Sequence, residues 1–293
     1  MYDIKALYEA ESVQHATELL LAHPDADVIA GGSDVLVQIR EGRRAGKELV
    51  SIYGLNELRG VTMEEDGTIR IGSLTSFSHI TSDPIIKEHI NVLGEAVDMV
   101  GGPQVRNIGT IGGNTCNGVT SADSASTLHA WDAIIEISGP EGIRQVPIKE
   151  FYIKAGKVDL RQGEIQTAIL IRKESYEGYK GHYTKYAMRN AMDIATTGCS
   201  VNVKLSEDKK TIVDARIAYG VAGPVPMRTP TAEALVKDQP ISKEICKKFG
   251  EAVLEDINPR DSWRASKAFR CHIGEVMAER GLEKAIVRAG GEI

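Results

Sequence analysis

The chain has 293 residues, of which 42% are hydrophobic and 26% are charged, so it is long enough for two domains with buried cores. Its formal net charge of −6 argues against nucleic acid as the main partner, because a phosphate backbone is bound by clustered lysine and arginine. No run approaches the roughly 18 apolar residues of a membrane span, and the first residues lack the pattern of a signal peptide, so we expect no membrane segment and a cytoplasmic location.

The first fifty residues mix helix and strand. Ser12 is the expected N-cap of a helix that ends near residues 23–24, because apolar residues recur at helical spacing after it. A short buried strand at residues 28–30 leads into the glycine-rich stretch Ala30–Asp34, and residues 49–52 are predicted to form a further strand.

A hairpin, a helix and a long polar segment are predicted next. Residues 61–72 pair two strands across a turn at residues 65–68. An amphipathic helix is predicted from Pro84 to Val100, because proline favours a first helical turn and glycines follow the last one. Residues 101–123 contain so little apolar material that we expect a loop that wraps a ligand.

The next hundred residues continue this irregular mixture. A short helix through residues 128–131, a hairpin over residues 133–148 and a strand at residues 168–171 are expected. Residues 173–181 are dominated by Lys, Glu, Gly and Tyr and are predicted to form a linker.

We place the domain boundary in this segment, with one domain over residues 1–176 and a smaller one over residues 177–293. The second domain begins with a hairpin over residues 201–221. Its remaining elements are predicted helices at residues 231–236, 242–254 and 265–289. Because strands and helices do not alternate regularly, the fold class is predicted to be α+β.

Two glycine-rich stretches carry the candidate chemistry: the first glycine stretch, Ala30–Asp34, and the second glycine stretch, Thr110–Asn114. Glycine tolerates positive φ and lets main-chain N–H groups approach an anion, so we expect the two stretches to cradle the two halves of one pyrophosphate. In a chain with 29 glycines a single Gly-Gly pair is typical of an ordinary turn. Neither stretch matches the Rossmann or Walker pattern.

The four cysteines and seven histidines form no ligand pattern. The cysteines include no CxxC pair, and the histidines show no His-x-x-x-His spacing, whereas iron–sulfur clusters and structural zinc sites normally have closely spaced ligands. We therefore expect no metal in this chain, and redox chemistry would need an organic cofactor.

In order and spacing, these motifs resemble the FAD-binding subunits of the molybdenum-containing hydroxylases, the family of xanthine dehydrogenase and carbon monoxide dehydrogenase. The resemblance runs nearly end to end. It is carried by the helix from Ser12, the Ala-Gly-Gly-Ser-Asp-x-Leu-Val-Gln turn from Ala30, and the segments Gln104–Asn114, Ser121–Asp123 and Arg189–Ala195. It implies a two-part FAD-binding domain of the vanillyl-alcohol-oxidase-like (PCMH) type, followed by a smaller α/β C-terminal domain.

The resemblance also implies the site. FAD would lie extended, with its pyrophosphate on the first glycine stretch, and Asp123 would bind a hydroxyl of its ribityl or ribose portion. The implied cofactor-binding residues are Ala30, Gly31, Gly32, Ser33, Asp34, Val35, Leu36, Thr110, Ile111, Gly113, Asn114, Asn117, Asp123, Ile169 and Leu170. No residue is predicted to be catalytic, because the chain shows single carboxylates and no acid–base constellation.

A separate short flavin chain of this layout is most similar to the middle subunit of a three-subunit xanthine dehydrogenase. That similarity implies a molybdopterin-binding partner that oxidises a purine, a [2Fe–2S] partner that relays electrons, and NAD+ as the acceptor, in a heterotrimer or its dimer. The alternatives are a flavin subunit for an aldehyde, a nicotinate-like heterocycle or carbon monoxide, a stand-alone flavin reductase of the same fold, and an interaction subunit that has lost FAD.

Overall fold

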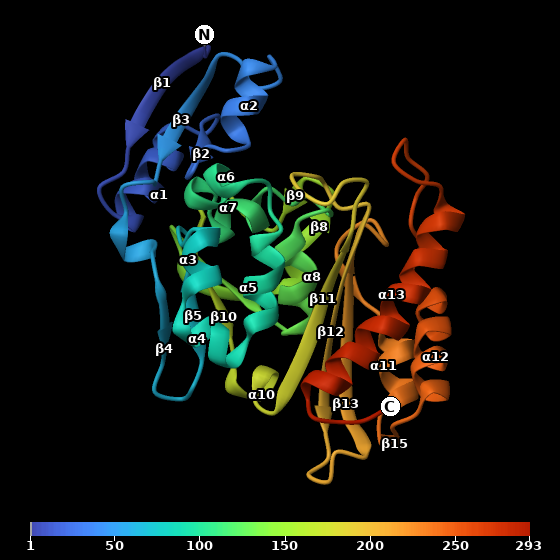
Figure 1. Ribbon diagram of the computed structural model, residues 1–293. Coiled ribbons are helices and arrows are strands. Elements are labelled where there is room, and N and C mark those ends of the chain that lie inside the picture. Colours follow the sequence, from blue (N-terminus) through green and yellow to red (C-terminus); the bar gives the residue numbers. More distant parts are fainter. Residues whose placement is uncertain (1) are drawn as a thin grey trace.

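In the computed structural model, which describes residues 2–293, three sheets of three to five strands follow one another from the N-terminus to the C-terminus (Figure 1). The first is a parallel sheet in the order β1-β3-β2 and forms a small N-terminal lobe. Ser12 caps the first helix by accepting a hydrogen bond from the His15 N–H, as predicted. The elements of this lobe are β1 (Ile4–Glu9), α1 (Val13–Ala22), β2 (Asp27–Ile29), α2 (Val35–Arg40) and β3 (Lys47–Ser51).

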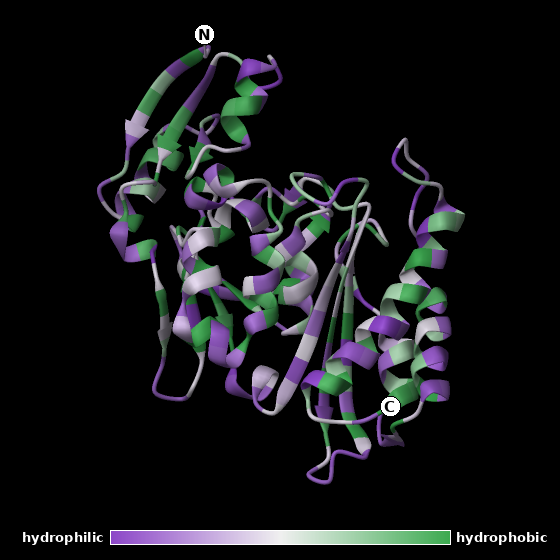
Figure 2. Cartoon of the chain, viewed as in Figure 1, coloured by the Kyte–Doolittle hydropathy of each residue, from purple (hydrophilic) through white to green (hydrophobic). Residues whose placement is uncertain are grey.

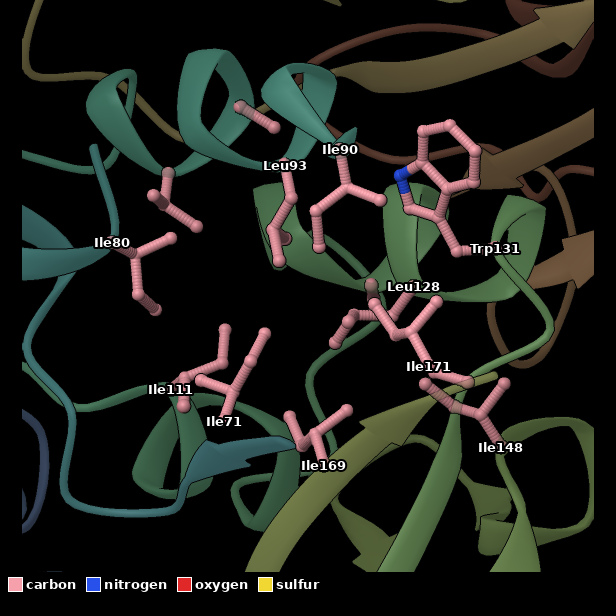
Figure 3. Close-up of a cluster of buried hydrophobic side chains, with 14 of the residues drawn as sticks. Ile71, Ile80, Ile90, Leu93, Ile111, Leu128, Trp131, Ile148, Ile169 and Ile171 are labelled. Atoms are coloured by element: carbon pink, nitrogen blue, oxygen red, sulfur yellow. The ribbon is translucent and has the colours of Figure 1, made fainter. Parts of the chain in front are cut away.

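The second sheet is antiparallel, in the order β4-β5-β10-β6-β7, and the hairpins predicted over residues 61–72 and 133–148 belong to it. Its inner face packs against helices α3, α5 and α8 through a continuous core to which Ile71, Ile169 and Ile171 contribute from the strands (Figure 3). The elements are η1 (Asn56–Leu58), β4 (Val61–Met63), β5 (Ile69–Gly72), α3 (Phe77–Ser82), α4 (Pro84–His89), α5 (Asn91–Asp98), α8 (Asp123–Ala130), β6 (Ile134–Gly139), β7 (Gly142–Pro147), α9 (Ile148–Phe151), β8 (Tyr152–Lys154), β9 (Lys157–Val158) and β10 (Ile165–Ile171).

The helix predicted from Pro84 to Val100 is two helices, α4 and α5. Ile90 separates them with φ −137° and ψ 44°, and its side chain is fully buried. Because the apolar pattern continues across Ile90, the sequence periodicity does not reveal the break.

The loop predicted over residues 101–123 is also wrong, because most of this segment is helical. It forms α6 (Pro103–Ile108), α7 (Ile111–Cys116) and the start of α8. Thr110 caps α7, and its hydroxyl oxygen accepts from the Gly113 N–H at 3.1 Å. The short polar side chains that suggested a loop therefore serve in part as helix caps.

The third sheet, with β11-β12-β13-β14 in order and β15 on β13, is covered on both faces. Alternate residues of β12 point in opposite directions: Cys199 and Val201 belong to the core beneath α12 and α13, while the Asn202 side chain donates to the Ala130 carbonyl at the end of α8. The turn between β12 and β13 is hydrophilic, as Figure 2 shows. The elements are β11 (Tyr179–Tyr186), β12 (Thr197–Leu205), β13 (Thr211–Gly220), β14 (Met227–Arg228), α11 (Pro230–Val236), β15 (Gln239–Pro240), α12 (Lys243–Ala252), η2 (Val253–Glu255) and α13 (Lys267–Arg288).

The segment predicted to be a linker, residues 173–181, instead forms α10 (Lys173–Tyr176) and the start of β11. Tyr176 and Tyr179 are buried in the core of the second sheet, so this segment is anchored by its aromatic residues. The α+β class is confirmed. In the described part of the chain, no helix has the length and apolar character that crossing a membrane requires.

Candidate functional site

A cavity of about 550 Å³ opens between the N-terminal lobe and the central sheet. Its wall is made by three segments that are distant in the sequence: the first glycine stretch after β2, the second glycine stretch with α7, and the start of β10. This volume lies within the range of roughly 300–1,000 Å³ that is usual for cofactor sites.

The first glycine stretch presents unpaired backbone donors. The N–H groups of Gly31, Gly32, Ser33, Asp34 and Val35 donate no hydrogen bond to any residue among 2–293. Gly32 has φ +72°, and its carbonyl accepts from the Leu36 N–H at 3.1 Å, which closes the turn into α2. Successive free N–H groups in a turn with a left-handed residue form a concave anion site. The prediction of a phosphate-shaped turn therefore has a geometric basis here.

Gly31 lies against the end of α6, just before the second glycine stretch. A Cβ atom at Gly31 would lie 1.9 Å from the carbonyl oxygen of Ile108, at the end of α6. Only glycine permits this approach. Since Ile108 precedes Thr110 by two residues, the first glycine stretch contacts the segment that leads into the second.

The second glycine stretch differs from the first because the N–H groups of its last four residues, Ile111 to Asn114, donate within the chain. The Ile111 N–H donates to the Thr75 carbonyl at 3.0 Å, and the Gly112 N–H donates to the Ser73 carbonyl at 2.8 Å. These four N–H groups are therefore not free to cradle half of a pyrophosphate, and such a role for the stretch stays a prediction. The second glycine stretch instead leaves room in the cavity wall. A Cβ at Gly113 would meet only the Thr110 Oγ1, at 2.9 Å, and would otherwise enter open space.

The strand β10 reaches the cavity with Ile165 and Gln166. Beside them lies Cys116, whose Sγ is 3.1 Å from the Gln166 Oε1. Burial raises the pKa of the Cys116 thiol to about 12. The thiol therefore stays protonated, and a protonated thiol is a poor nucleophile.

Most of the predicted residues line the cavity, and a few do not. Those in its wall are Ala30, Gly31, Gly32, Ser33, Asp34, Val35, Thr110, Gly113, Asn114 and Asn117. Those outside it are Leu36, Ile111, Asp123, Ile169 and Leu170. Ile111 and Ile169 are fully buried in the central core, and Leu170 points to the opposite face of β10. Sequence reasoning missed Gln166, whose signal was a single amide in a strand of otherwise apolar or small residues.

Asp123 lies at the start of α8 and is buried. Its two carboxylate oxygens accept from the Tyr183 hydroxyl at 2.7 Å and the Lys185 Nζ at 2.8 Å, both on β11. Burial raises the pKa of Asp123, and the Lys185 ammonium opposes that rise. A carboxylate has about four acceptor positions, so its contact with a cofactor hydroxyl stays a prediction.

Comparison with known families shows which family this chain belongs to. A family described as the FAD binding domain in molybdopterin dehydrogenase matches residues 2–172, and one described as the CO dehydrogenase flavoprotein C-terminal domain matches residues 182–285. The chain belongs to the FAD-binding subunits of molybdopterin dehydrogenases. It is an oxidoreductase flavoprotein subunit of this molybdenum hydroxylase family.

Relatives of this FAD-binding subunit span its whole length. It is 41% identical to the xanthine dehydrogenase FAD-binding subunit of Escherichia coli O157:H7 over all of both chains, and 29% identical to the nicotinate dehydrogenase FAD-subunit of Eubacterium barkeri over 81% of each. A solved carbon monoxide dehydrogenase from Hydrogenophaga pseudoflava superposes with a TM-score of 0.92 at 28% identity, covering 98% of this chain and 99% of that one. The two-part fold expected from the resemblance is confirmed.

The cavity residues fit FAD by their own chemistry. Five free N–H groups suit a pyrophosphate, and the close approach at Gly31 leaves the two stretches facing one cavity. Within residues 2–293, no three His, Cys, Asp or Glu side chains are grouped as a metal-binding set. That this chain carries no metal of its own stays a prediction.

Proposed function

We propose that this chain is the FAD-carrying electron-transfer subunit of a xanthine dehydrogenase-type enzyme, which receives electrons from an iron–sulfur subunit and delivers them to NAD+. The purine assignment is supported by the 41% identity with a xanthine dehydrogenase subunit, against 27–29% for the nicotinate and carbon monoxide relatives. Because those relatives also align over most of the chain, the choice of substrate is a proposal about the molybdenum partner and not about this cavity.

The observation that carries the proposal is the set of free N–H groups in Gly31–Val35, five consecutive residues that all line the cavity. We assign the pyrophosphate of FAD to these groups. Asn114 and Asn117 offer side-chain contacts from α7 and the residue that follows it. The contact of Asp123 with a sugar hydroxyl stays part of the proposal although Asp123 lies outside the cavity wall, where it accepts from Tyr183 and Lys185. When bound, FAD supplies the redox chemistry, because a flavin can accept electrons one at a time and pass them on as a pair.

The chain's own residues bind and orient the cofactor. Its neutral, protonated thiol at Cys116 favours noncovalent attachment. Apolar side chains at Phe77, Val100 and Val105 line another part of the wall and exclude water there. No proton transfer by a side chain of this subunit is part of the proposal.

The partners follow from the same assignment. We propose a molybdopterin-binding subunit and a [2Fe–2S] subunit as partners, in a heterotrimer or its dimer, in the cytoplasm. We also keep the division into residues 1–176 and 177–293 as a proposal, since β10 ends at Ile171 and β11 begins at Tyr179.

The purified subunit tests the proposal. We expect one noncovalent FAD per chain, released by acid precipitation, and reduction of the bound flavin when NADH is added anaerobically. Iron and molybdenum are expected only when the partner chains are co-purified. A protein that takes up no added FAD contradicts the assignment, and a bound flavin that NADH does not reduce contradicts the NAD+ part alone.

Purine turnover is then measured on the assembled complex. Xanthine or hypoxanthine is offered beside nicotinate, an aldehyde and carbon monoxide. We expect NAD+ reduction with the purine. Turnover of one of the other substrates instead identifies a different molybdenum partner and leaves the role of this chain unchanged.

A further inference from the structure

One end of the third sheet carries exposed apolar side chains that the proposed function does not use. They come from the residue after α5, from the loop between β11 and β12, and from the segment around the start of α13; the last two lie at the same end of the sheet (Figure 1). We call this set the apolar face, and its members, 40% to 76% exposed, are Met99, Tyr186, Met188, Met192, Ile194, Trp263 and Phe269. Methionine and aromatic side chains are enriched in protein interfaces.

Contacts join these segments into one surface beside the cavity. The rings of Tyr186 and Phe269 meet edge to face, with their centroids 5.7 Å apart. At the other side of the same loop, Met192 lies against Gly102, because a Cβ there would be 3.6 Å from the Met192 Cε. Gly102 closely follows Val100, which lines the cavity. The apolar face therefore adjoins the cavity wall.

A buried arginine fixes the segment before α13. Arg270 is 3% exposed. Its Nε donates to the Thr196 carbonyl at 3.2 Å, and its terminal nitrogens donate to the Ser262 Oγ at 2.7 Å and to the Arg260 carbonyl. Trp263 therefore stands on an ordered segment, although 76% of its surface is exposed. An exposed tryptophan on an ordered segment loses little entropy on binding and is typical of an interface hot spot.

The apolar face has a positively charged rim. Residues 258–270 contain four cations and one carboxylate, in a chain whose net charge is −6. The four cations are Arg260, Arg264, Lys267 and Arg270. The Lys267 Nζ donates to the neutral Asn258 side chain at 2.7 Å, and the Arg264 guanidinium lies 4.2 Å from the centroid of the Trp263 ring. The first turn of α13 contains no acidic residue, although a helix N-terminus favours one. This concentration of positive charge favours an acidic partner.

We infer that the apolar face and its positive rim receive an acidic face of the [2Fe–2S] subunit. This inference rests on the proposed function, in which that subunit delivers electrons to FAD. Electron transfer requires the two cofactors to lie close together, and the apolar face adjoins the cavity wall at Gly102 and Val100. An iron–sulfur cluster held by cysteine thiolates also carries net negative charge, which a positive receiving surface attracts.

The test measures binding of the separately purified [2Fe–2S] subunit to the immobilised, FAD-loaded chain by biolayer interferometry. We expect Trp263→Ala to weaken binding by at least about tenfold, mainly through faster dissociation. Lys267→Glu should weaken binding by about tenfold at low salt, mainly through slower association. The matched controls are Ile143→Ala, at a side chain 70% exposed on β7, and Arg280→Glu, at an exposed position in the middle of α13. Equal losses in variants and controls overturn the proposal.

Ionic strength separates charge from packing. Salt screens exposed charges, so the affinity of the wild type should fall as the salt concentration rises. The difference between wild type and Lys267→Glu should shrink at high salt, whereas the defect of Trp263→Ala should persist. Wild-type affinity that does not change with salt overturns the proposal of an acidic partner face.

Melting of the chain without partners separates docking from folding. Lys267→Glu removes a cation from the rim and places an acidic side chain in the first turn of α13, so this variant should melt no earlier than wild type. Trp263→Ala truncates an exposed side chain and should keep the wild-type FAD content. Weaker binding of the [2Fe–2S] subunit with unchanged melting and FAD content is the expected combination. Wild-type affinity in both variants overturns the proposal.

The other possible occupants are a molybdopterin-binding subunit and a second copy of this chain. Loss of affinity for the molybdopterin-binding subunit alone overturns the proposal, and so does self-association that Trp263→Ala abolishes in sedimentation. A wild-type chain that takes up FAD but does not bind the [2Fe–2S] subunit overturns the docking surface and leaves the FAD assignment intact. A wild-type chain that takes up no FAD overturns the proposed function itself.

Discussion

Gly31 and Gly32 are neighbours that require glycine for different physical reasons. At Gly31 the obstacle is steric, because a Cβ would lie 1.9 Å from the Ile108 carbonyl oxygen. At Gly32 the obstacle is conformational, because φ is +72° and branched side chains strongly disfavour that region. Gly113, by contrast, has an ordinary helical backbone and needs only the space beside Thr110.

Replacing these glycines is expected to remove FAD. Gly31→Ala pushes the first glycine stretch away from α6, and Gly32→Val strains the turn that presents the free N–H groups. Both variants should show no FAD binding in a titration that resolves the wild-type dissociation constant. They should also show a smaller rise in melting temperature on FAD addition, because bound cofactor stabilises by mass action. Gly113→Val should act similarly by filling the cavity side of α7.

Gly54→Val is the control for this series. Gly54 is exposed, has no positive φ, and a Cβ there meets nothing within 4 Å. Gly67, in the turn between β4 and β5, is not suitable as a control, because a valine at its φ of +83° would itself be strained. Full FAD content in both Gly31→Ala and Gly32→Val would show that the first glycine stretch is only a turn.

Asn114→Ala should have a milder effect. Asn114 lines the cavity, and its Oδ1 accepts from the Ser124 hydroxyl at 2.6 Å. The substitution removes hydrogen bonds and introduces no clash, so FAD affinity should fall by roughly one order of magnitude. Isothermal titration with FAD checks this. A complete loss of binding, equal to that of Gly32→Val, would show that Asn114 shapes the cavity.

At the scale of elements, α8 contains a histidine that should make stability depend on pH. Burial lowers the pKa of His129 to about 4. Its Nδ1 lies 2.7 Å from the Ala125 carbonyl, to which it donates, and its Nε2 has no partner among residues 2–293. Between pH 6.5 and about 4, the unfolded chain binds a proton at this site and the folded chain does not, so the free energy of unfolding falls as pH is lowered.

The lowered pKa of His129 corresponds to a loss of about 3 kcal/mol in the free energy of unfolding between pH 6.5 and about 4. His129→Asn keeps a donor for the Ala125 carbonyl and removes the titration. Its stability should therefore decline less than that of wild type between pH 6.5 and 4. Urea unfolding at several pH values measures this. His272→Asn, at an exposed position on α13, is the control, and parallel profiles for wild type and His129→Asn contradict the prediction.

Elements with a local chemical signal could be predicted from the sequence. The Ser12 cap and the turns of both central hairpins depend on a few adjacent residues, and these elements are confirmed. The break at Ile90 and the burial of Tyr176 depend on tertiary packing, which the local pattern does not contain. The helical character of residues 103–116 was missed because its polar caps resemble loop composition.

The same distinction applies to the site. The first glycine stretch was found because its chemistry lies in consecutive residues. The contribution of β10 was placed at Ile169 and Leu170, whereas the cavity meets this strand at Ile165 and Gln166. Which part of a buried strand meets a cavity is set by the register of the sheet and its bulge, and neither is visible in one sequence.

At the scale of the molecule, the N-terminal and C-terminal parts are joined through β11. Tyr179 and Tyr183 of this strand lie in the same core as the central sheet. Tyr183 and Lys185 bind both oxygens of Asp123, and the Lys185 Nζ also donates to the Met99 carbonyl at 2.9 Å. One buried ammonium therefore links α8, the segment before α6 and the third sheet.

Removal of this ammonium should destabilise the whole chain. The side chains of Lys185 and Asp123 are 8% and 7% exposed, so Lys185→Met leaves a buried carboxylate without its counter-charge. Breaking one partner of such a pair costs about 3 kcal/mol or more. We expect the free energy of unfolding, measured in urea without FAD, to fall by about that amount.

The double variant Asp123→Asn/Lys185→Met separates charge from packing. Because it removes both charges, it should recover part of the loss seen in Lys185→Met. The defect of Lys185→Met should also shrink as pH falls: burial already raises the pKa of Asp123, and without the ammonium that opposes this rise the carboxyl takes up its proton more readily. If Lys185→Met unfolds at the wild-type urea concentration at neutral pH, the ion pair contributes no net stability. If the double variant is less stable than Lys185→Met, the unpaired charge is not the cause of the loss, and the charge argument is wrong.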